Sequence, residues 1–220
     1  QATIRNALED QDKAVRAAAI AAQKKGRRPA WGDLLAKLFK SEKHLKTRKE
    51  ILHALAASKA PAAGALVAEI LKNAKSNSDF IPEALNLAAM AGGDAMRDAV
   101  SALLASDLPA ANRTEIVVQA VETLGKMKDA KAAPTLALRA GDTQPRVAIA
   151  ATLALGQMNN SVSREALIDR LLHDNRTDIR RSAAVALSNL RAREAIPALL
   201  EVYNDKEIGK EVIKALCATP

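Results

Sequence analysis

An apolar pair with members eight residues apart recurs along the second half of the sequence at intervals of about thirty residues. The pairs are Ile116 and Leu124, Val147 and Leu155, Ile179 and Leu187, and Ile208 and Leu216. Their first members lie 31, 32 and 29 residues apart in turn. A fixed period of this length is typical of helical hairpins stacked side by side, because each hairpin buries its apolar face only against its neighbours. The period therefore constrains the fold more than any single residue does.

The position four residues after each first member is also apolar and mostly small. It is filled by Ala120, Ala151, Ala183 and Val212. Offsets of 0, 4 and 8 lie on one face of a helix, so each set predicts the buried stripe of the second helix of a hairpin. The first helices are predicted at 132–138 and 195–200. There Pro134 and Pro197 stand in the opening turn, where proline is tolerated.

These signals predict an all-α chain, an α-solenoid of about seven helical hairpins in a single repeat domain over residues 1–220. The expected hairpins span residues 2–26, 29–58, 59–93, 94–129, 130–160, 161–192 and 193–220. Composition agrees, because the 49% apolar share is mostly Ala and Leu and only four residues are aromatic. The sequence begins with Gln1 rather than Met, so we expect a processed chain or a piece of a longer protein.

A motif of an acidic residue, an apolar-arginine pair and a downstream Leu-Gly pair accompanies the predicted second helices. It is carried by Asp10 with Val15-Arg16, Asp174 with Ile179-Arg180, Leu124-Gly125 and Leu155-Gly156. With it the chain resembles HEAT repeats, and most of all the short bacterial subtype shared with phycobilisome lyase subunits. Leu187-Ser188 and Leu216-Cys217 depart from the glycine of that pattern. The resemblance implies a right-handed superhelix with the second helices on its concave side, and it says little about function.

The acidic residues and arginines of this motif have a structural interpretation. An Asp that precedes a helix can cap its free N–H groups. We expect Arg16 and Arg180 to bridge to an Asp of the neighbouring hairpin, with ligand contact as the alternative. Cys217, the single cysteine, stands at the small-residue position of the motif, where we expect a small buried side chain.

Residue patterns required for catalysis or metal binding are missing from the sequence. His44, His53 and His173 lack the spacing of zinc ligands, and the His-Glu dipeptides of HEAT-type di-iron enzymes do not occur. Neither GxxxxGKS/T nor GxGxxG occurs, and one cysteine excludes an internal disulfide framework. No uncharged run is apolar enough to span a membrane, and charges throughout the first thirty residues argue against a signal peptide. We therefore predict a non-catalytic protein with no cofactor and no metal.

The excess positive charge lies wholly in the first quarter of the sequence. The formal net charge is +8, and residues 1–60 hold 14 Lys or Arg against 6 Asp or Glu, which leaves residues 61–220 neutral. A one-ended basic field attracts nucleic acid, acidic protein segments or a membrane surface. A solvated surface that aids solubility is the alternative. The polyanion-binding candidates are Lys24, Lys25, Arg27, Arg28, Lys37, Lys40, Lys46, Arg48 and Lys49.

Polar residues on the expected concave face form the other candidate site. When offsets 0, 4 and 8 are buried, residues near offsets 2, 6 and 9 face outward. The partner-binding candidates are Lys49, His53, Glu83, Asn86, Gln119, Glu122, Arg181 and Ser188. Their mixed chemistry fits a protein partner better than a polyanion, with contact to water alone as the alternative.

Three functions are therefore open. The first is a scaffold for protein–protein interaction, the second is binding of nucleic acid or another polyanion through residues 24–49, and the third, by family analogy only, is a bilin-lyase-like subunit. The last predicted helix adds one more expectation. Ile208, Val212, Ile213 and Leu216 give it a wide apolar face, so we expect further chain beyond it or docking on another subunit.

Overall fold

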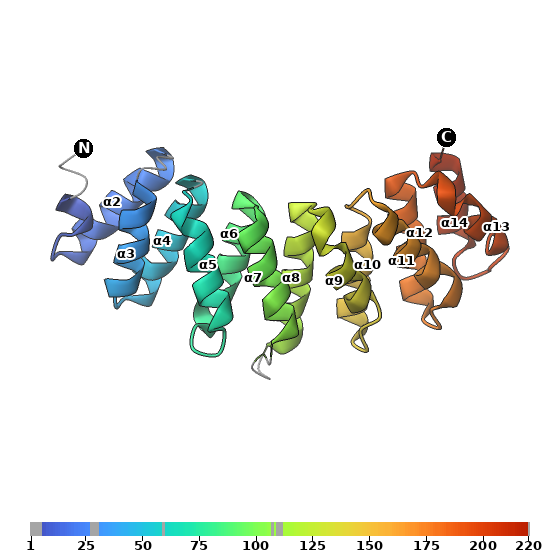
Figure 1. Cartoon of the computed structure of the whole chain (residues 1–220), viewed down its shortest axis with the longest axis horizontal. Helices are drawn as coiled ribbons and strands as arrows, with labels where there is room; N and C mark the ends of the chain where they lie inside the picture. The colour runs from blue at the N-terminus through green and yellow to red at the C-terminus, as the bar shows by residue number, and fades with distance from the viewer. Residues whose placement is uncertain (1–5, 27–30, 59, 107, 109–111, 220) are drawn as a thin grey trace. The chain divides into compact units, whose positions relative to one another are not determined.

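The computed structural model describes residues 6–26, 31–58, 60–106, 108 and 112–219. Every regular element in these ranges is helical, and none of them is a strand. The predicted fold class, an all-α solenoid of helical hairpins, is confirmed (Figure 1). The chain divides into two compact units, Gln1–Leu108 and Pro109–Pro220, called unit 1 and unit 2 and described separately below. The expectation of a single repeat domain stays a prediction.

Unit 1 contains two layers of helices. In one layer α2 (Lys13–Gly26), α4 (Leu45–Ser58) and α6 (Ile81–Ala91) pack in succession, and in the other α3 (Gly32–Ser41), α5 (Ala62–Lys72) and α7 (Asp94–Ala105) do so. Helix α3 packs on α4, and α5 packs on α6, so each forms a hairpin. A 3-10 turn, η2 (Ser78–Phe80), leads into α6. Gly92 and Gly93 link α6 to α7 with φ of 66° and 96°, a conformation that favours glycine.

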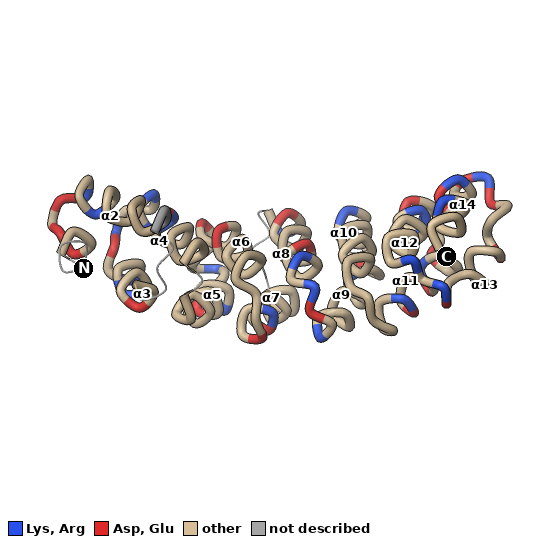
Figure 2. Tube along the Cα trace, turned by 90° about the horizontal axis from the view of Figure 1, so that it is seen from above, with Lys and Arg blue, Asp and Glu red and all other residues tan. Residues whose placement is uncertain are grey.

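Unit 2 repeats the same plan with first helices of 8, 13 and 6 residues. Its second helices are α8 (Arg113–Met127), α10 (Pro145–Leu155), α12 (Thr177–Leu190) and α14 (Gly209–Ala218), and each packs on the next. Its first helices are α9 (Ala133–Ala140), α11 (Ser161–His173) and α13 (Ile196–Glu201) (Figure 2). Two 3-10 turns, η3 (Ala130–Ala132) and η4 (Arg193–Ala195), precede α9 and α13. Pro134 and Pro197 stand in the first turns of α9 and α13, as predicted.

The predicted apolar stripes of the second helices lie in the core of unit 2. On α10 the side chains of Val147, Ala151 and Leu155 are buried, and the matching residues of α8 and α12 are buried as well. In the last repeat the stripe is buried at Ile208, which directly precedes α14, and at Val212, and it is half-buried at Leu216. Fully burying an aliphatic side chain contributes roughly 1.5–3 kcal/mol, so these stripes hold the layers together.

The glycine of the Leu-Gly pair allows neighbouring second helices to approach closely. A Cβ atom added to Gly125 would lie 2.8 Å from the Cβ of Ala154, and one added to Gly156 would lie 2.7 Å from the Cβ of Ala186. Neither distance is possible for real side chains, so the small residue is required by the helix that follows. Offset 9 of a second helix therefore faces the next helix, whereas the sequence predicted that it faces outward.

Cys217 occupies the same offset on α14, and its predicted burial is wrong. The side chain is exposed. Ile213, at an offset that is buried on α10 and α12, is 52% exposed. The reason is that α14 packs on α12 and α13, and no described helix covers its other side.

Candidate interaction surface

One side chain at the same offset on each second helix of unit 2 points away from the core. These four residues, which we call the cross-helix row, are Glu122 on α8, Leu153 on α10, Val185 on α12 and Lys214 on α14. They lie 31, 32 and 29 residues apart, as do the first members of the apolar pairs. All four are exposed. The repeat thus places an acid, two apolar residues and a base in line across four neighbouring helices.

The middle of this row is an exposed apolar patch. Leu153 is 39% exposed and Val185 is 38% exposed, and the half-buried Val118 and Ile149 lie one turn earlier on α8 and α10. Helix α10 has a single charged residue, Arg146, in its first turn. The outer face of α10 therefore offers only apolar contacts over its last two turns. An apolar centre within a polar rim is the usual anatomy of a protein interface.

Charged residues border the patch along the amino-terminal ends of the second helices. Arg146 Nη1 lies 2.8 Å from Glu115 Oε1 and joins α10 to α8. Arg181 Nη1 lies 2.9 Å from Asp178 Oδ1, and Arg181 Nη2 donates a 3.1 Å hydrogen bond to the backbone oxygen of Glu207. The pKa of Glu115 is lowered, first by a hydrogen bond from its own backbone N–H and then by Arg146. The arginines of this border are therefore already paired with carboxylates of the same surface.

All eight predicted partner-binding residues lie on second helices. Lys49 and His53 are on α4, Glu83 and Asn86 on α6, Gln119 and Glu122 on α8, and Arg181 and Ser188 on α12. His53, Asn86 and Glu122 are exposed, and the other five are half-buried. In unit 1, Lys49 Nζ lies 3.0 Å from Glu83 Oε1. Ser188 stands at the offset that faces the next helix. A binding role for these residues stays a prediction.

The predicted basic cluster is divided between the two helix layers of unit 1. Arg27 and Arg28, and the side chains of Lys24 and Lys25, lie outside the described residues. Lys37 and Lys40 are on α3, whereas Lys46, Arg48 and Lys49 are on α4. Lys40 Nζ lies 2.7 Å from Glu69 Oε2, and Lys49 pairs with Glu83. Two of these cations therefore already have carboxylate partners within the unit.

Arg48 has a partner that the sequence analysis missed. Its guanidinium carbon lies 4.3 Å from the ring centre of Phe39 and 4.2 Å from that of Phe80. The two rings meet edge to face, with centres 5.3 Å apart. Burial lowers the pKa of Arg48, and its buried Nε has no hydrogen-bond partner among the described atoms. Arg48 therefore contributes a cation–π contact that ties α3, α4 and η2 together.

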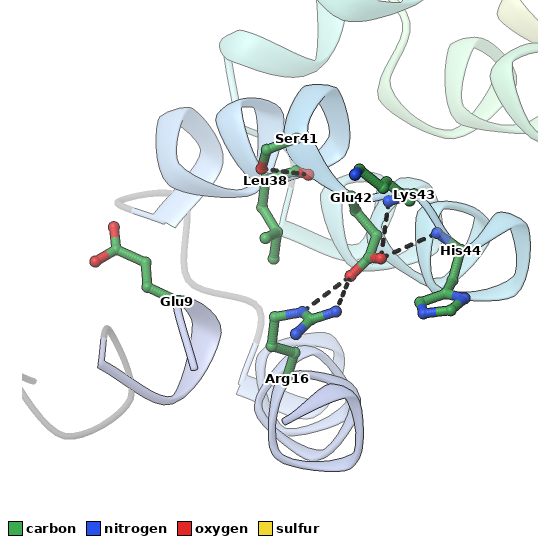
Figure 3. Close-up of a pocket in the computed structure, with 7 residues that line it drawn as sticks. All are labelled: Glu9, Arg16, Leu38, Ser41, Glu42, Lys43 and His44. Atoms are coloured by element: carbon green, nitrogen blue, oxygen red, sulfur yellow. Dashed lines mark hydrogen bonds and ion pairs between the residues drawn. The ribbon is translucent and has the colours of Figure 1, made fainter. Parts of the chain in front are cut away.

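The loop between α3 and α4 holds a buried carboxylate next to an open pocket of about 400 Å³ (Figure 3). Glu42 Oε2 accepts hydrogen bonds from Arg16 Nε at 2.9 Å and Nη2 at 2.7 Å, and Oε1 accepts them from the N–H groups of Lys43 and His44. Burial alone would raise the pKa of Glu42, but the His44 N–H and Arg16 outweigh it and lower this pKa. Both carboxylate oxygens are occupied, so the cluster is structural.

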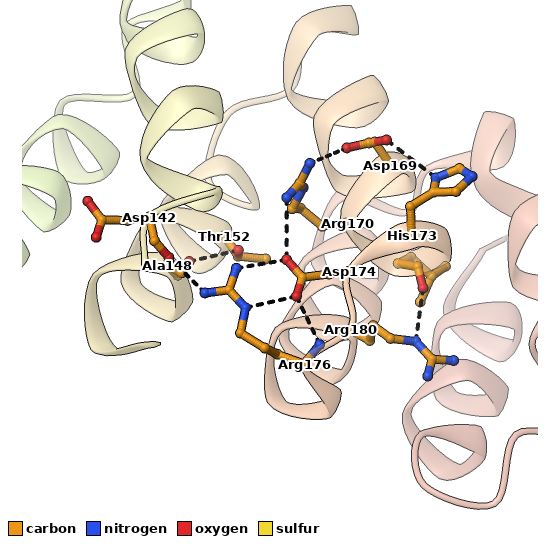
Figure 4. A network of polar contacts seen from close by, with 10 residues as sticks. Asp142, Ala148, Thr152, Asp169, Arg170, His173, Asp174, Arg176 and Arg180 are labelled. Carbon is orange, nitrogen blue, oxygen red and sulfur yellow. Dashed lines mark hydrogen bonds and ion pairs between the residues drawn. The ribbon is translucent and has the colours of Figure 1, made fainter. Parts of the chain in front are cut away.

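A second cluster of this kind lies between the α9–α10 and α11–α12 loops of unit 2 (Figure 4). Asp174 is bound by Arg176 at 2.9 Å and by Arg170 at 3.3 Å, and Arg176 Nη1 donates to the backbone oxygen of Asp142 at 2.7 Å. The hydrogen bond from Arg176 is the largest cause of the lowered pKa of Asp174. Arg176 thereby joins two successive hairpins.

The predicted bridge to an Asp of the next hairpin is confirmed for Arg180, whereas the partner of Arg16 is a Glu, and the predicted cap at Asp174 is wrong. Arg16 reaches Glu42 of the next hairpin, and Arg180 forms an ion pair with Asp205 of the next hairpin. Asp174 does not cap α12, because its Oδ1 accepts the N–H of Arg176, the residue that itself precedes the helix. The acidic side chain thus closes the turn before the helix, and the N-cap residue Arg176 makes no side-chain capping hydrogen bond.

The described residues contain neither a cluster of metal ligands nor a helix that could span a membrane. Across the described residues, no three His, Cys, Asp or Glu side chains are grouped as a metal site would require. His173 Nδ1 lies 3.3 Å from Asp169 Oδ1 on the exposed side of α11. Within these ranges, every helix is too short or too polar to cross a membrane.

The fold and the cross-helix row together define an α-helical repeat protein with an outward-facing layer of second helices. Residues 101–188 match the family described as HEAT repeats, and residues 179–205 match the PBS lyase HEAT-like repeat. Residues 101–205 therefore carry HEAT-type repeats, close to the PBS-lyase subtype.

Two solved structures are similar to this chain over nearly its full length. The complex of CpcE and CpcF of phycocyanin lyase from Nostoc sp. PCC7120 matches with a TM-score of 0.56 and 18% identity, over 98% of this chain and 92% of that chain. Human deoxyhypusine hydroxylase in complex with glycerol matches with a TM-score of 0.50 and 15% identity, over 99% and 83%. At these identities the likeness shows the fold alone. No curated protein matches the sequence.

Proposed function

We propose that the chain is a non-catalytic repeat scaffold that binds another protein through the second-helix surface of unit 2. The observation that carries this proposal is the exposed apolar pair Leu153 and Val185, on adjacent helices of the second-helix layer, with charged residues along the amino-terminal ends of those helices. Exposed apolar side chains grouped in this way and rimmed by charge are a common mark of an interaction site.

The charges on this surface support a protein partner over a polyanion. Acidic residues (Glu115, Glu122 and Asp178) and basic residues (Arg146, Arg181 and Lys214) are interspersed on the four second helices. A polyanion would be repelled by the acids, whereas a protein can match both signs. The match to the CpcE and CpcF complex adds a case in which this fold occurs together with another protein.

The polyanion and lyase functions stay predictions with less support. In unit 1, Arg48 is engaged by two phenyl rings, and Lys40 and Lys49 are paired with carboxylates. For a lyase function, the support is likeness of fold alone.

Site-directed photocrosslinking tests the proposal with a matched control. A photoreactive residue is placed at Val185 on α12, or at Leu138, which is 76% exposed on α9 in the layer of first helices. In a lysate of the source cells we expect a discrete crosslinked protein from position 185 and none from position 138. Leu153→Lys should abolish that product with little loss of stability, because the side chain is already partly in water. Equal crosslinking from both positions, or a product that survives Leu153→Lys, would contradict the proposal.

A further inference from the structure

The two ends of the cross-helix row carry opposite charges that pair with no other residue in the part of the chain that the structure describes. Glu122 on α8 and Lys214 on α14 are exposed, and neither forms an ion pair with another described residue. The charges bordering the row at Arg146 and Arg181 are paired, by contrast. The row therefore presents a free acid, two apolar side chains and a free base in that order.

We propose that the partner presents an amphipathic helix that lies along this row. Its basic side chain would face Glu122, two apolar side chains would cover Leu153 and Val185, and its acidic side chain would face Lys214. This inference rests on the proposed function and names the chemistry of the partner. Charge complementarity at both ends and apolar contact in the middle determine which segments fit.

The surface favours a helix over an extended peptide because it offers no backbone partners. The row crosses the sides of α8, α10, α12 and α14, whose interior N–H and C=O groups are bonded within each helix. An extended peptide over Leu153 and Val185 would leave its own backbone groups unpaired against apolar side chains, which is costly. A helix satisfies these groups internally and exposes only side chains to the surface.

Helix geometry determines the spacing of the partner's contact residues. Packed helices lie about 8–10 Å apart, and a helix rises about 1.5 Å per residue, so roughly five to seven residues of the partner cover one step of the row. Seven residues are close to two helical turns, which keeps the contacts on one face. The expected partner pattern is a base, an apolar residue, a second apolar residue and an acid, each about seven positions after the last. The whole pattern spans about 22 residues, or roughly 33 Å of helix.

The test uses labelled peptides of about 28 residues on an Ala- and Gln-rich helical background. One peptide carries Lys, Leu, Leu and Glu at seven-residue intervals, a second carries Lys at both ends, and a third carries Glu at both ends. Fluorescence anisotropy at low salt measures their affinity for the wild-type chain, Glu122→Lys and Lys214→Glu. A helix can bind in either direction, so the end charges must be changed one at a time.

We expect each charge substitution to change which of the three peptides binds most tightly. The wild type should prefer the Lys/Glu peptide, Glu122→Lys the Glu/Glu peptide and Lys214→Glu the Lys/Lys peptide, each by about threefold to tenfold, as for exposed charge pairs turned from attraction to repulsion. Leu153→Lys should abolish binding of all three, whereas Leu138→Lys on the opposite layer should leave them unchanged.

Failure of this inference can be separated from failure of the proposed function. If photocrosslinking places the partner on this surface but peptide preference ignores the end charges, the function stands and the helix inference is overturned. Equal binding of a peptide with the same side chains but a central proline would also overturn it, because that peptide cannot form the helix. Crosslinks from position 138 alone would contradict both the helix inference and the proposed function.

Discussion

The close approach of α8 and α10 at Gly125 leads to a prediction opposite to the usual rule. Replacing a helical glycine by alanine normally stabilises a helix by about 1 kcal/mol. At Gly125 the new methyl group would lie 2.8 Å from the Cβ and 3.1 Å from the Cα of Ala154. Neither atom can move by a rotamer change, so α10 must shift. We therefore expect Gly125→Ala to destabilise unit 2.

The magnitude follows from two opposing contributions. Overpacking a core position costs about 1–3 kcal/mol, and the contact with backbone places Gly125→Ala in the upper part of that range. After the gain in helix propensity, the net loss should be about 1–2 kcal/mol. Ala154→Gly alone should cost about 2 kcal/mol, from lost propensity and one buried methyl group. The double substitution moves the methyl group from one helix to the other and should cost about 1 kcal/mol or less, so the coupling is about 2 kcal/mol.

Urea-induced unfolding followed by far-UV circular dichroism measures these four proteins. Native-state hydrogen exchange in α8 and α10 shows whether the loss is local to this contact, which matters because repeat proteins do not always unfold in one step. A stability of Gly125→Ala equal to or above that of the wild type would refute the reasoning. Additive losses in the double variant would refute it as well, since they would mean that the two residues do not share the contact.

Three further predictions use other contacts. Gly64→Ala on α5 should stabilise unit 1 by about 0.5–1 kcal/mol in the same urea assay, because its Cβ would meet Met96 Cε at an ordinary 3.8 Å; a loss of stability would contradict this. Arg48→Lys keeps the charge but loses the planar stacking, so thermal unfolding should report a loss of about 1 kcal/mol, whereas an unchanged stability would mean that only the charge matters. The pKa of Glu42 is lower in the folded chain than in the unfolded chain, so the ionised carboxylate stabilises the folded chain at pH values above the ordinary carboxyl pKa. This stabilisation is lost as the pH falls through the lowered pKa. Glu42→Gln should weaken the dependence of stability on pH below roughly pH 4, and an unchanged profile would count against this.

The candidate surface was only partly predictable from the sequence. The period predicted that offset 6 faces outward, and Glu122 was found in this way. Leu153 and Val185 stand at the same offset but were not predicted as surface residues, because an apolar residue in a repeat is ordinarily assigned to the core. Comparing offset 6 across all four repeats would have found them, since the position is the same in each helix.

Two contacts within unit 1, the Arg48 cation–π contact and the Lys40–Glu69 ion pair, lay beyond any local pattern. Phe39 and Phe80 are far apart in the sequence, and nothing in their spacing predicts that Arg48 covers both rings. The same holds for the pairing of Lys40 with Glu69. These contacts depend on how far each helix is displaced along its neighbour, which the spacing of apolar residues within one helix does not determine.

By itself the sequence determined the helical hairpins, their period and the buried stripe of each second helix, because these follow from the geometry of a single helix and the need to cover its apolar face. Only the tertiary structure decided that offset 9 meets the next helix, that Arg176 joins two successive hairpins, and that an acid and a base without a described ion-pair partner end the cross-helix row. Each of these depends on the distance between helices about thirty residues apart, and that distance is set by the packing of both layers.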